Sequence, residues 1–227
     1  MNRIVQPEYL DQLPPADPQA LHSRRDLRRL NALMRHPAIL AAHLHRFARQ
    51  NHFSKITELG AGDGTFLLGA AQKSSSSVPM QNVTLLDFKD NVSQETLAAF
   101  KKIGWQPQVV VADVFQWPDA ETQIVVANLF LHHFETGPLR MLLSRIAQRA
   151  KVFIAIEPRR CQWSLAWAQL LGLIGCNAVT RHDAVVSVKA GFVARELSGL
   201  WPAGPEWHMT EEFAPPFSHL FVAQSLR

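Results

Sequence analysis

Residues 58–64 read Glu58-Leu59-Gly60-Ala61-Gly62-Asp63-Gly64, and the interpretation of the fold depends on this run. The apolar segment 55–59 before it predicts a strand, and the pattern of 65–72 after it predicts a helix. Glycines at alternating positions let the backbone turn sharply and approach a ligand closely, because glycine has no side chain and tolerates positive φ. Unpaired N–H groups at the start of the following helix suit an anionic group such as a carboxylate. The run therefore predicts a ligand-binding loop between a strand and a helix.

The spacing of the glycines separates two classes of cofactor. A dinucleotide-binding fingerprint reads G-x-G-x-x-G. Counted from Gly60, its last glycine would fall at Thr65, whereas here the third glycine comes one residue earlier. The pattern E-x-G-x-G-x-G instead resembles motif I of the class I S-adenosylmethionine (SAM)-dependent methyltransferases of the small-molecule type. The resemblance extends over roughly residues 53–157, and it implies SAM as cofactor and S-adenosylhomocysteine as its product.

Composition indicates one globular domain with a sizeable core. The chain has 227 residues, of which 47% are hydrophobic and 19% charged, with a net charge of +4 and an isoelectric point near 9.4. Cys161 and Cys176 would lie about 22 Å apart on one helix, which is beyond disulfide reach. Neither the cysteines nor the histidines show a metal-ligand spacing, so we predict no metal. We expect a cytoplasmic protein, because the N-terminus has no apolar signal core.

The pattern along the chain predicts an α/β fold with a Rossmann-like, doubly wound sheet. Strands and helices alternate, which is typical of a parallel sheet covered by helices on both faces. The predicted strands span 55–59, 83–86, 108–112, 124–127 and 151–156, and the predicted helices span 63–73, 91–102 and 137–150. Two late β-like segments, 207–213 and 219–224, indicate a terminal antiparallel hairpin. This hairpin would complete the seven-stranded, mostly parallel sheet that the resemblance implies.

We divide the chain into an N-terminal helical cap, 1–52, and a SAM-binding methyltransferase domain, 53–227. Within the second part, 159–200 is expected to be an insertion that forms the acceptor pocket or a lid over it. Residues 161–180 of this insertion include no charged residue. Polar residues dilute the segment, so a buried helix or an apolar lid is expected rather than a membrane span. Asp183 is expected to cap a helix at 184–190.

The acceptor pocket is expected to be apolar or aromatic. The N-terminal helices and the stretch 159–200 are expected to build this pocket, and the apolar side chains of the stretch that suggest such an acceptor are Trp163, Trp167, Leu170, Leu171 and Leu173. The alternative is that these side chains belong to the core.

Four arginines gather on a helix predicted at 19–34, which a second helix at 38–50 follows. They are Arg24, Arg25, Arg28 and Arg29. On a helix they form two i,i+4 pairs of like charge, which disfavour each other unless an acid lies nearby. One interpretation is a solvated face. The other is a dock for an acidic partner such as a carrier protein, with nucleic acid the less expected partner.

Two acidic residues follow predicted strands at positions that suit an adenosine ligand. Asp87 ends the second strand, where a carboxylate can accept hydrogen bonds from both ribose hydroxyls. Asp113 follows the third strand, and the resemblance implies that it accepts a hydrogen bond from the adenine amine while Val114 or Phe115 contacts the ring. Either aspartate could instead be a helix cap or a turn residue. The cofactor-binding residues that the resemblance implies are Glu58, Gly60, Ala61, Gly62, Gly64, Asp87, Phe88, Asp113, Val114 and Asn128.

The segment 128–134 looks like motif IV of small-molecule methyltransferases, where Leu-His-His is frequent. It lacks the Asn/Asp-Pro-Pro-Tyr/Phe tetrad of the amino-group methyltransferases that act on adenine or glutamine. His133 is the first candidate for a general base and His132 the second, because imidazole suits proton removal near neutral pH. At least one of the two is expected to be structural. Glu157 is expected at the rim of the site, paired with Arg159 or facing the substrate.

The leading hypothesis is a SAM-dependent O- or C-methyltransferase that acts on a small, hydrophobic or aromatic metabolite. An RNA or protein methyltransferase is the alternative that the basic isoelectric point and the arginine cluster suggest. A third interpretation is a non-catalytic SAM-binding accessory protein. An NAD-dependent dehydrogenase is more distant, because position 65 is threonine. The sequence does not name the acceptor, the methylated atom or the oligomeric state.

Overall fold

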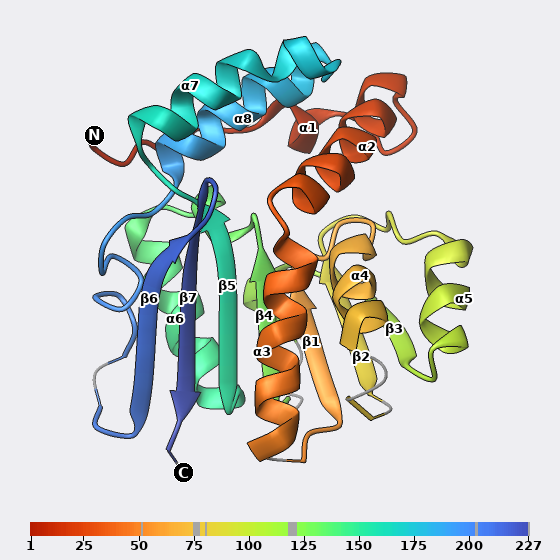
Figure 1. The fold of residues 1–227 in the computed structure, drawn as a ribbon, viewed down its shortest axis with the longest axis vertical. Coiled ribbons are helices and arrows are strands. Elements are labelled where there is room, and N and C mark those ends of the chain that lie inside the picture. Colours follow the sequence, from red (N-terminus) through yellow and green to blue (C-terminus); the bar gives the residue numbers. More distant parts are fainter. Residues whose placement is uncertain (51, 75–77, 80, 118–121, 203, 227) are drawn as a thin grey trace.

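A computed structural model describes residues 1–227 of the chain except 51, 75–77, 80, 118–121, 203 and 227. Its centre is a seven-stranded sheet with the strand order β3-β2-β1-β4-β5-β7-β6 (Figure 1). The strands are β1 (Lys55–Leu59), β2 (Asn82–Asp87), β3 (Gln106–Val111), β4 (Ile124–Asn128), β5 (Val152–Pro158), β6 (Trp207–Ala214) and β7 (Ser218–Ser225). The first five strands are parallel, and β7 runs antiparallel to both β5 and β6. The predicted doubly wound sheet and its terminal hairpin are therefore confirmed.

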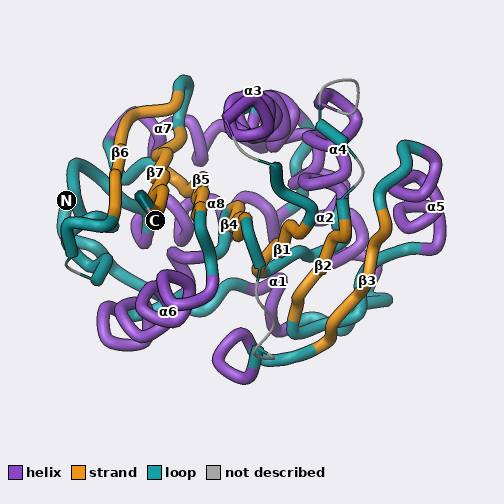
Figure 2. The backbone as a smooth tube through the Cα atoms, turned by 90° about the horizontal axis from the view of Figure 1, so that it is seen from below, coloured by secondary structure: helices purple, strands orange, loops and turns teal. Residues whose placement is uncertain are grey.

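Helices cover both faces of the sheet, which explains why the central strands are apolar on both sides. Every residue of β4 and β5 is buried. The helices α3 (His36–Gln50), α4 (Thr65–Ser74) and α5 (Gln94–Lys102) lie on one side of the sheet, and α6 (Thr136–Arg149) lies on the other (Figure 2). Leu40, Leu44 and Phe47 of α3 join the main core cluster with Leu67 of α4. The second helix predicted in the N-terminal region, 38–50, corresponds to α3 and is therefore part of the core.

The remaining helices form a roof over the carboxyl ends of the parallel strands (Figure 1). They are α1 (Tyr9–Gln12), α2 (Pro18–Leu33), α7 (Gln162–Leu170), the short 3-10 helix η3 (Leu171–Ile174) and α8 (Ala178–Ala190). Open α/β sheets bind ligands at this edge. The roof thus brings the start of the chain and the segment after β5 together over the expected site.

The predicted cap at Asp183 is wrong. Helix α8 begins at Ala178, and the Asn177 side chain caps it by accepting a hydrogen bond from the Thr180 backbone N–H at 2.8 Å. An asparagine is as good an N-cap as an aspartate, so the earlier signal starts the helix. Asp183 lies inside the helix, where its carboxylate is free for another partner. Among the described residues, no helix is long and apolar enough to cross a membrane.

Candidate active site

The glycine loop adopts the backbone conformation that its sequence predicts. Gly60, Gly62 and Gly64 have φ angles of 65°, 56° and 72°, which residues with a Cβ rarely adopt. A Cβ at Gly60 would collide with the ring of Phe130, and one at Gly64 would lie 3.0 Å from Leu85 Cδ1. A Cβ at Gly62 would meet no described atom within 4 Å. Gly60 and Gly64 therefore allow close packing, whereas Gly62 leaves open space on the ligand side.

Asp87 holds this loop in place. Its Oδ2 accepts a hydrogen bond from the Gly62 backbone N–H at 2.8 Å, and its Oδ1 accepts one from the Lys89 N–H at 2.8 Å. A carboxylate offers about four lone-pair positions, so Asp87 can still accept hydrogen bonds from a ligand. The neighbouring Phe88 is 76% exposed. Asp87 thus joins the ends of β1 and β2 and also faces the ligand space.

A cavity of about 540 Å³ begins at the loop and runs along the carboxyl edge of the sheet. It brings together all the predicted site residues except Gly64. Those that line it are Glu58, Gly60, Ala61, Gly62, Asp87, Phe88, Asp113, Val114, Asn128, His132 and His133. Its volume lies in the range typical of small-molecule sites. A second cavity of about 790 Å³ at the opposite edge, near Ser54, Thr122 and Lys151, is lined by none of the predicted residues.

Glu58 is a buried acid in this cavity. Its Oε2 atom has no hydrogen-bond partner among the described residues, although the side chain is only 2% exposed. Burial raises the pKa of Glu58 well above its ordinary value, and the charges of Asp63 and Asp87 act in the same direction. A positively charged group or a hydrogen-bond donor in the cavity would offset the cost of burying the Glu58 carboxyl group without a partner.

Asp113 caps a short 3-10 helix, Val114–Gln116. Its Oδ1 accepts a hydrogen bond from the Phe115 backbone N–H at 2.8 Å. The aspartate lies at the cavity wall beside Val114 and Phe115. The cap leaves its second oxygen free for a ligand, so capping and ligand binding are compatible.

Asn128 belongs to a buried polar network that joins the sheet to the N-terminal helices. Its Oδ1 lies 2.7 Å from His36 Nδ1, and its Nδ2 donates to Asn31 Oδ1 at 3.1 Å. His36 Nε2 in turn lies 2.6 Å from Ser218 Oγ. Burial lowers the pKa of His36 to about 4, although the hydrogen bond to Asn128 acts in the opposite direction and raises it. At neutral pH His36 is therefore neutral and links α3 to β4 and β7.

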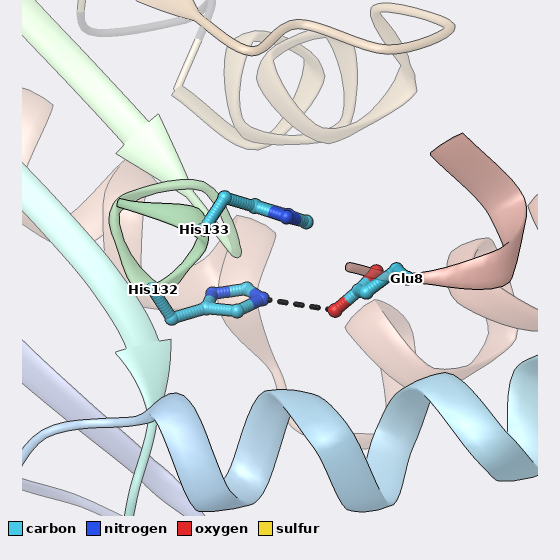
Figure 3. A group of neighbouring side chains, drawn as sticks. All are labelled: Glu8, His132 and His133. Atoms are coloured by element: carbon cyan, nitrogen blue, oxygen red, sulfur yellow. Dashed lines mark hydrogen bonds and ion pairs between the residues drawn. The ribbon is translucent and has the colours of Figure 1, made fainter. Parts of the chain in front are cut away.

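His132 lies between two carboxylates. Its Nδ1 is 2.8 Å from Glu157 Oε2. Its Nε2 is 3.2 Å from Glu8 Oε1, a contact that Figure 3 shows. Burial alone would lower the pKa of His132, but the hydrogen bonds and charges of Glu157 and Glu8 outweigh it and raise the pKa to about 9. His132 is therefore protonated at neutral pH in this arrangement, with both ring nitrogens engaged.

Glu157 does not lie at the rim of the site, contrary to prediction. It is fully buried, and it accepts hydrogen bonds from the backbone N–H groups of Phe130 at 3.0 Å and Leu131 at 2.8 Å. Arg159 points elsewhere, because its guanidinium lies over the ring of Phe213, 4.2 Å from the centroid. Near the end of β5 the Glu157 side chain points inward, and its hydrogen bonds there fix the loop that carries both histidines.

His133 is the more accessible of the two histidines. Its side chain is 25% exposed, and its Nδ1 lies 3.4 Å from Asp11 Oδ2. Asp11, Glu8 and Ser187 also line the cavity, and sequence analysis assigned no role to any of them. No local signal could have found them, because they reach the site only through the folding of the N-terminal segment and α8 over the sheet.

Glu8, His132 and His133 place one ligand atom each within 4.8 Å of one another, a set that could hold a metal. The two imidazole rings lie 4.3 Å apart and are tilted by 31° (Figure 3). Both ring nitrogens of His132 are engaged by Glu157 and Glu8, so a metal would have to displace one of these contacts. The absence of a metal remains a prediction.

Polar contacts hold the N-terminal segment over the cavity. The backbone N–H groups of Tyr9 and Leu10 donate to the Asp183 carboxylate at 2.8 and 2.9 Å. The Lys89 ammonium donates to the carbonyl of Asp11 at 2.7 Å. Arg3 donates to the carbonyls of Ala190 and Phe134, each at 2.8 Å. The segment thus spans from α8 to the loop after β2 and covers the site.

The arginines of α2 do not act as one patch. Arg28 forms an ion pair with Asp63 of the glycine loop at 2.9 Å, and Arg24 donates to the carbonyl of Pro15 at 2.8 Å. Arg29 lies 3.7 Å from the buried Asp26. Asp63 and Asp26 of the same chain therefore reduce the repulsion among these arginines.

Little of the predicted insertion 159–200 lines this cavity, and its role in acceptor binding remains a prediction. Trp163, Leu170 and Leu173 do not line the cavity and are exposed by 81%, 49% and 82%. They face outward on the roof, whereas Leu171 is buried in a small core cluster and Trp167 packs against that cluster. Of the whole segment 159–200, Ser187 alone lines this cavity among the described residues.

No protein-family model matches this sequence, and no curated protein sequence matches it either. Solved structures do match. The plantazolicin methyltransferase BpumL in complex with S-adenosylhomocysteine superposes with a TM-score of 0.65 at 12% identity, covering 92% of this chain and 91% of its own. The chain has the class I methyltransferase fold.

Two other methyltransferase structures share this fold. Magnesium protoporphyrin IX methyltransferase from Synechocystis PCC 6803, with bound SAM, has a TM-score of 0.56 at 14% identity, with 89% of this chain and 83% of that chain covered. An O-methyltransferase family protein from Burkholderia thailandensis has a TM-score of 0.58 at 14% identity, with 87% and 56% covered. Within the methyltransferase fold, the cavity described above lies at the edge where the sheet binds its ligands.

Proposed function

We propose that this protein is a SAM-dependent methyltransferase that acts on an oxygen or carbon atom of a small, hydrophobic or aromatic metabolite. The observation that carries the proposal is the single cavity that connects the glycine loop, Asp87 and Asp113 with His133. Such a reaction requires a place for the cofactor and a group that can accept a proton, and this cavity offers residues for both.

The cofactor end fits SAM in shape and charge. Gly62 leaves open space where the carboxylate or the chain of an amino-acid moiety could lie, and Asp87 has lone pairs for the ribose hydroxyls. The unpartnered Glu58 Oε2 suits a cationic ligand, because a positive charge would offset the cost of burying this acid. Asp113 and Val114 would hold the adenine ring.

Bound SAM would supply an electrophilic methyl group on a sulfonium. The chain would then mainly have to align the acceptor and exclude water. The N-terminal segment serves the second purpose, since Glu8, Leu10 and Asp11 close the cavity from above. The acceptor end has aromatic walls. Phe134 contacts Phe115 and Phe130 edge to face, with centroids 5.6 and 5.1 Å apart.

His133 is the residue that would take a proton from the acceptor. Asp11 Oδ2 lies 3.4 Å from its Nδ1, which would favour a proton on Nδ1 and leave Nε2 to accept one from the acceptor. His132 has a positioning role in this scheme, because its two nitrogens are engaged by Glu157 and Glu8. The pair thus divides into one structural and one reactive histidine.

Calorimetric titration with SAM, S-adenosylhomocysteine and NAD tests the proposal. The wild type should bind both sulfur ligands and not NAD. Asp87→Ala should lose S-adenosylhomocysteine affinity by at least about tenfold, since it removes the ribose acceptor and loosens Gly62. Asp90→Ala, an exposed acid three residues further on, is the matched control and should bind normally.

A preference for NAD, or no binding of either sulfur ligand by a folded protein, would reject the proposed cofactor. A screen of phenolic and enolic acceptors by release of S-adenosylhomocysteine follows. Turnover with RNA or a protein, and none with small molecules, would reject the proposed acceptor class and leave the cofactor assignment intact. Tight SAM binding without turnover on any acceptor would indicate an accessory protein.

A further inference from the structure

The outer face of the roof carries an apolar crest on α7 and η3. We define the crest as Trp163, Leu170, Leu173 and Ile174, which are exposed by 81%, 49%, 82% and 42%. All four lie on the continuous stretch formed by α7 and η3, and each of them is exposed there. The uncharged stretch 161–180 surrounds them, so no charge within that stretch interrupts the crest. None of the four belongs to a core cluster of the described residues, so their side chains are exposed to solvent.

Basic side chains border the crest at its η3 end. Arg181 lies against Gly172, where an added Cβ would come within 3.2 Å of its Cδ and Nη1. The Asn177 backbone N–H donates to Asp26 Oδ2 at 2.9 Å, and Arg29 lies 3.7 Å from Asp26 Oδ1, so Arg29 also lies near this end of the crest. The Arg29 side chain is 66% exposed, and Arg25 on the same helix is also exposed.

We propose that the crest and its basic border dock this protein on the surface of a membrane that contains anionic phospholipid. An exposed tryptophan with aliphatic neighbours suits the boundary between headgroups and acyl chains, where its ring is amphipathic. Arginines beside such an apolar face are attracted by anionic headgroups. Because no described helix can span a bilayer, the contact would be at the interface.

A second copy of the chain fits this surface less well. In a symmetric dimer the same patch occupies both sides, so Arg29 and Arg181 of both copies would lie in or beside one apolar interface that offers them no acidic partner from the crest. Four side chains also make a small patch, whereas a stable interface buries about 800 Å² on each partner. A lipid surface requires no such area, and its negative charge complements the arginines.

Vesicle sedimentation tests the proposal with two kinds of vesicle. One contains phosphatidylcholine alone, and the other contains equal parts of phosphatidylcholine and phosphatidylglycerol. The wild type should bind the anionic vesicles at least about tenfold more tightly, and high salt should weaken that binding. The double variant Trp163→Ser/Leu173→Ser should lose at least about tenfold in vesicle affinity, since burying one large apolar side chain already supplies about that factor.

Two further variants separate the contributions. Met141→Ser removes another exposed apolar side chain, 63% exposed on α6, and should bind vesicles like the wild type. Arg29→Gln/Arg181→Gln should lose the preference for anionic vesicles. Circular dichroism and thermal melting check that each variant is folded. These readouts do not depend on SAM or on turnover, so they test the surface separately from the proposed function.

Two results would overturn the proposal. One is a folded wild type that binds neither kind of vesicle. The other is vesicle binding that the crest variant retains in full. Sedimentation velocity tests whether a second copy of the chain covers the crest instead. If the wild type is a dimer and Trp163→Ser/Leu173→Ser is a monomer, the crest is a dimer interface, and this result would also overturn lipid docking.

Discussion

The carboxylate of Glu157 lies 2.8 Å from Nδ1 of His132, and neither side chain is exposed to more than 2%. The contact joins the end of β5 to the loop after β4, at the centre of the proposed active site. A buried charge pair of this kind links the stability of the fold to pH.

We expect His132→Gln to change how thermal stability depends on pH. Glu157 and Glu8 raise the pKa of His132 to about 9, above its ordinary value of 6.5, after overcoming the opposing effect of burial. The contribution of protonated His132 to the stability of the fold is therefore fully present below about pH 6.5 and is lost as pH rises through about 9. The melting temperature of the wild type should fall across this window, and that of the variant should fall less, by at least about 2–4 °C. Parallel curves would contradict the charged state of His132.

Gly62→Ala should weaken ligand binding without unusual loss of stability. A residue with a Cβ at a φ of 56° costs about 1–2 kcal/mol, and the methyl group would also enter the ligand space. Gly104→Ala is the matched control, because Gly104 also has a positive φ and open space around its Cβ position but lies outside the cavity lining. Both variants should lose similar melting temperature, and only Gly62→Ala should lose S-adenosylhomocysteine affinity in calorimetry. Equal affinities would place the ligand elsewhere.

His133→Gln should lower kcat by about a hundredfold or more once an acceptor has been identified, because a positioned general base contributes that much. Binding of S-adenosylhomocysteine should stay within about twofold, since His133 lies at the other end of the cavity. Steady-state kinetics and calorimetry measure the two effects. Asp11→Asn should reduce kcat by a smaller factor, because Asp11 acts through His133. An unchanged kcat for His133→Gln would show that the acceptor needs no base.

Asp183→Ala should loosen the N-terminal segment. The substitution removes the acceptors of the Tyr9 and Leu10 backbone N–H groups, and hydrogen bonds to a charged group contribute about 1.5–3 kcal/mol each. Hydrogen exchange at these two amides should therefore become at least about tenfold faster, while amides of β4 should be unaffected. Protection that survives the substitution would mean that the other contacts of the segment, such as those of Arg3, Glu8 and Lys89, hold it without Asp183.

Sequence reasoning reached the parts of the site that are contiguous in the chain. The glycine loop, Asp87 and Asp113 each follow a strand, so their positions at one edge of the sheet follow from the strand pattern. It placed Glu157 at the rim, because a strand end does not show whether its last side chain points outward or inward. It placed Trp163 at the pocket, because hydrophobicity alone does not show which face of a helix is covered.

The sequence by itself determined the α/β class, the seven strands and the glycine loop, because these depend on local periodicity and on glycines that a tight turn requires. The tertiary structure alone decided what lies opposite the two histidines. Glu8 and His132 are 124 residues apart, and they meet only because α1 and α8 fold over the carboxyl edge of the sheet. It also decided that His132 is charged and His36 neutral, since two carboxylates surround the first and burial among neutral partners governs the second. The charge state of a buried histidine depends on neighbours distant in sequence, and local pattern carries no information about them.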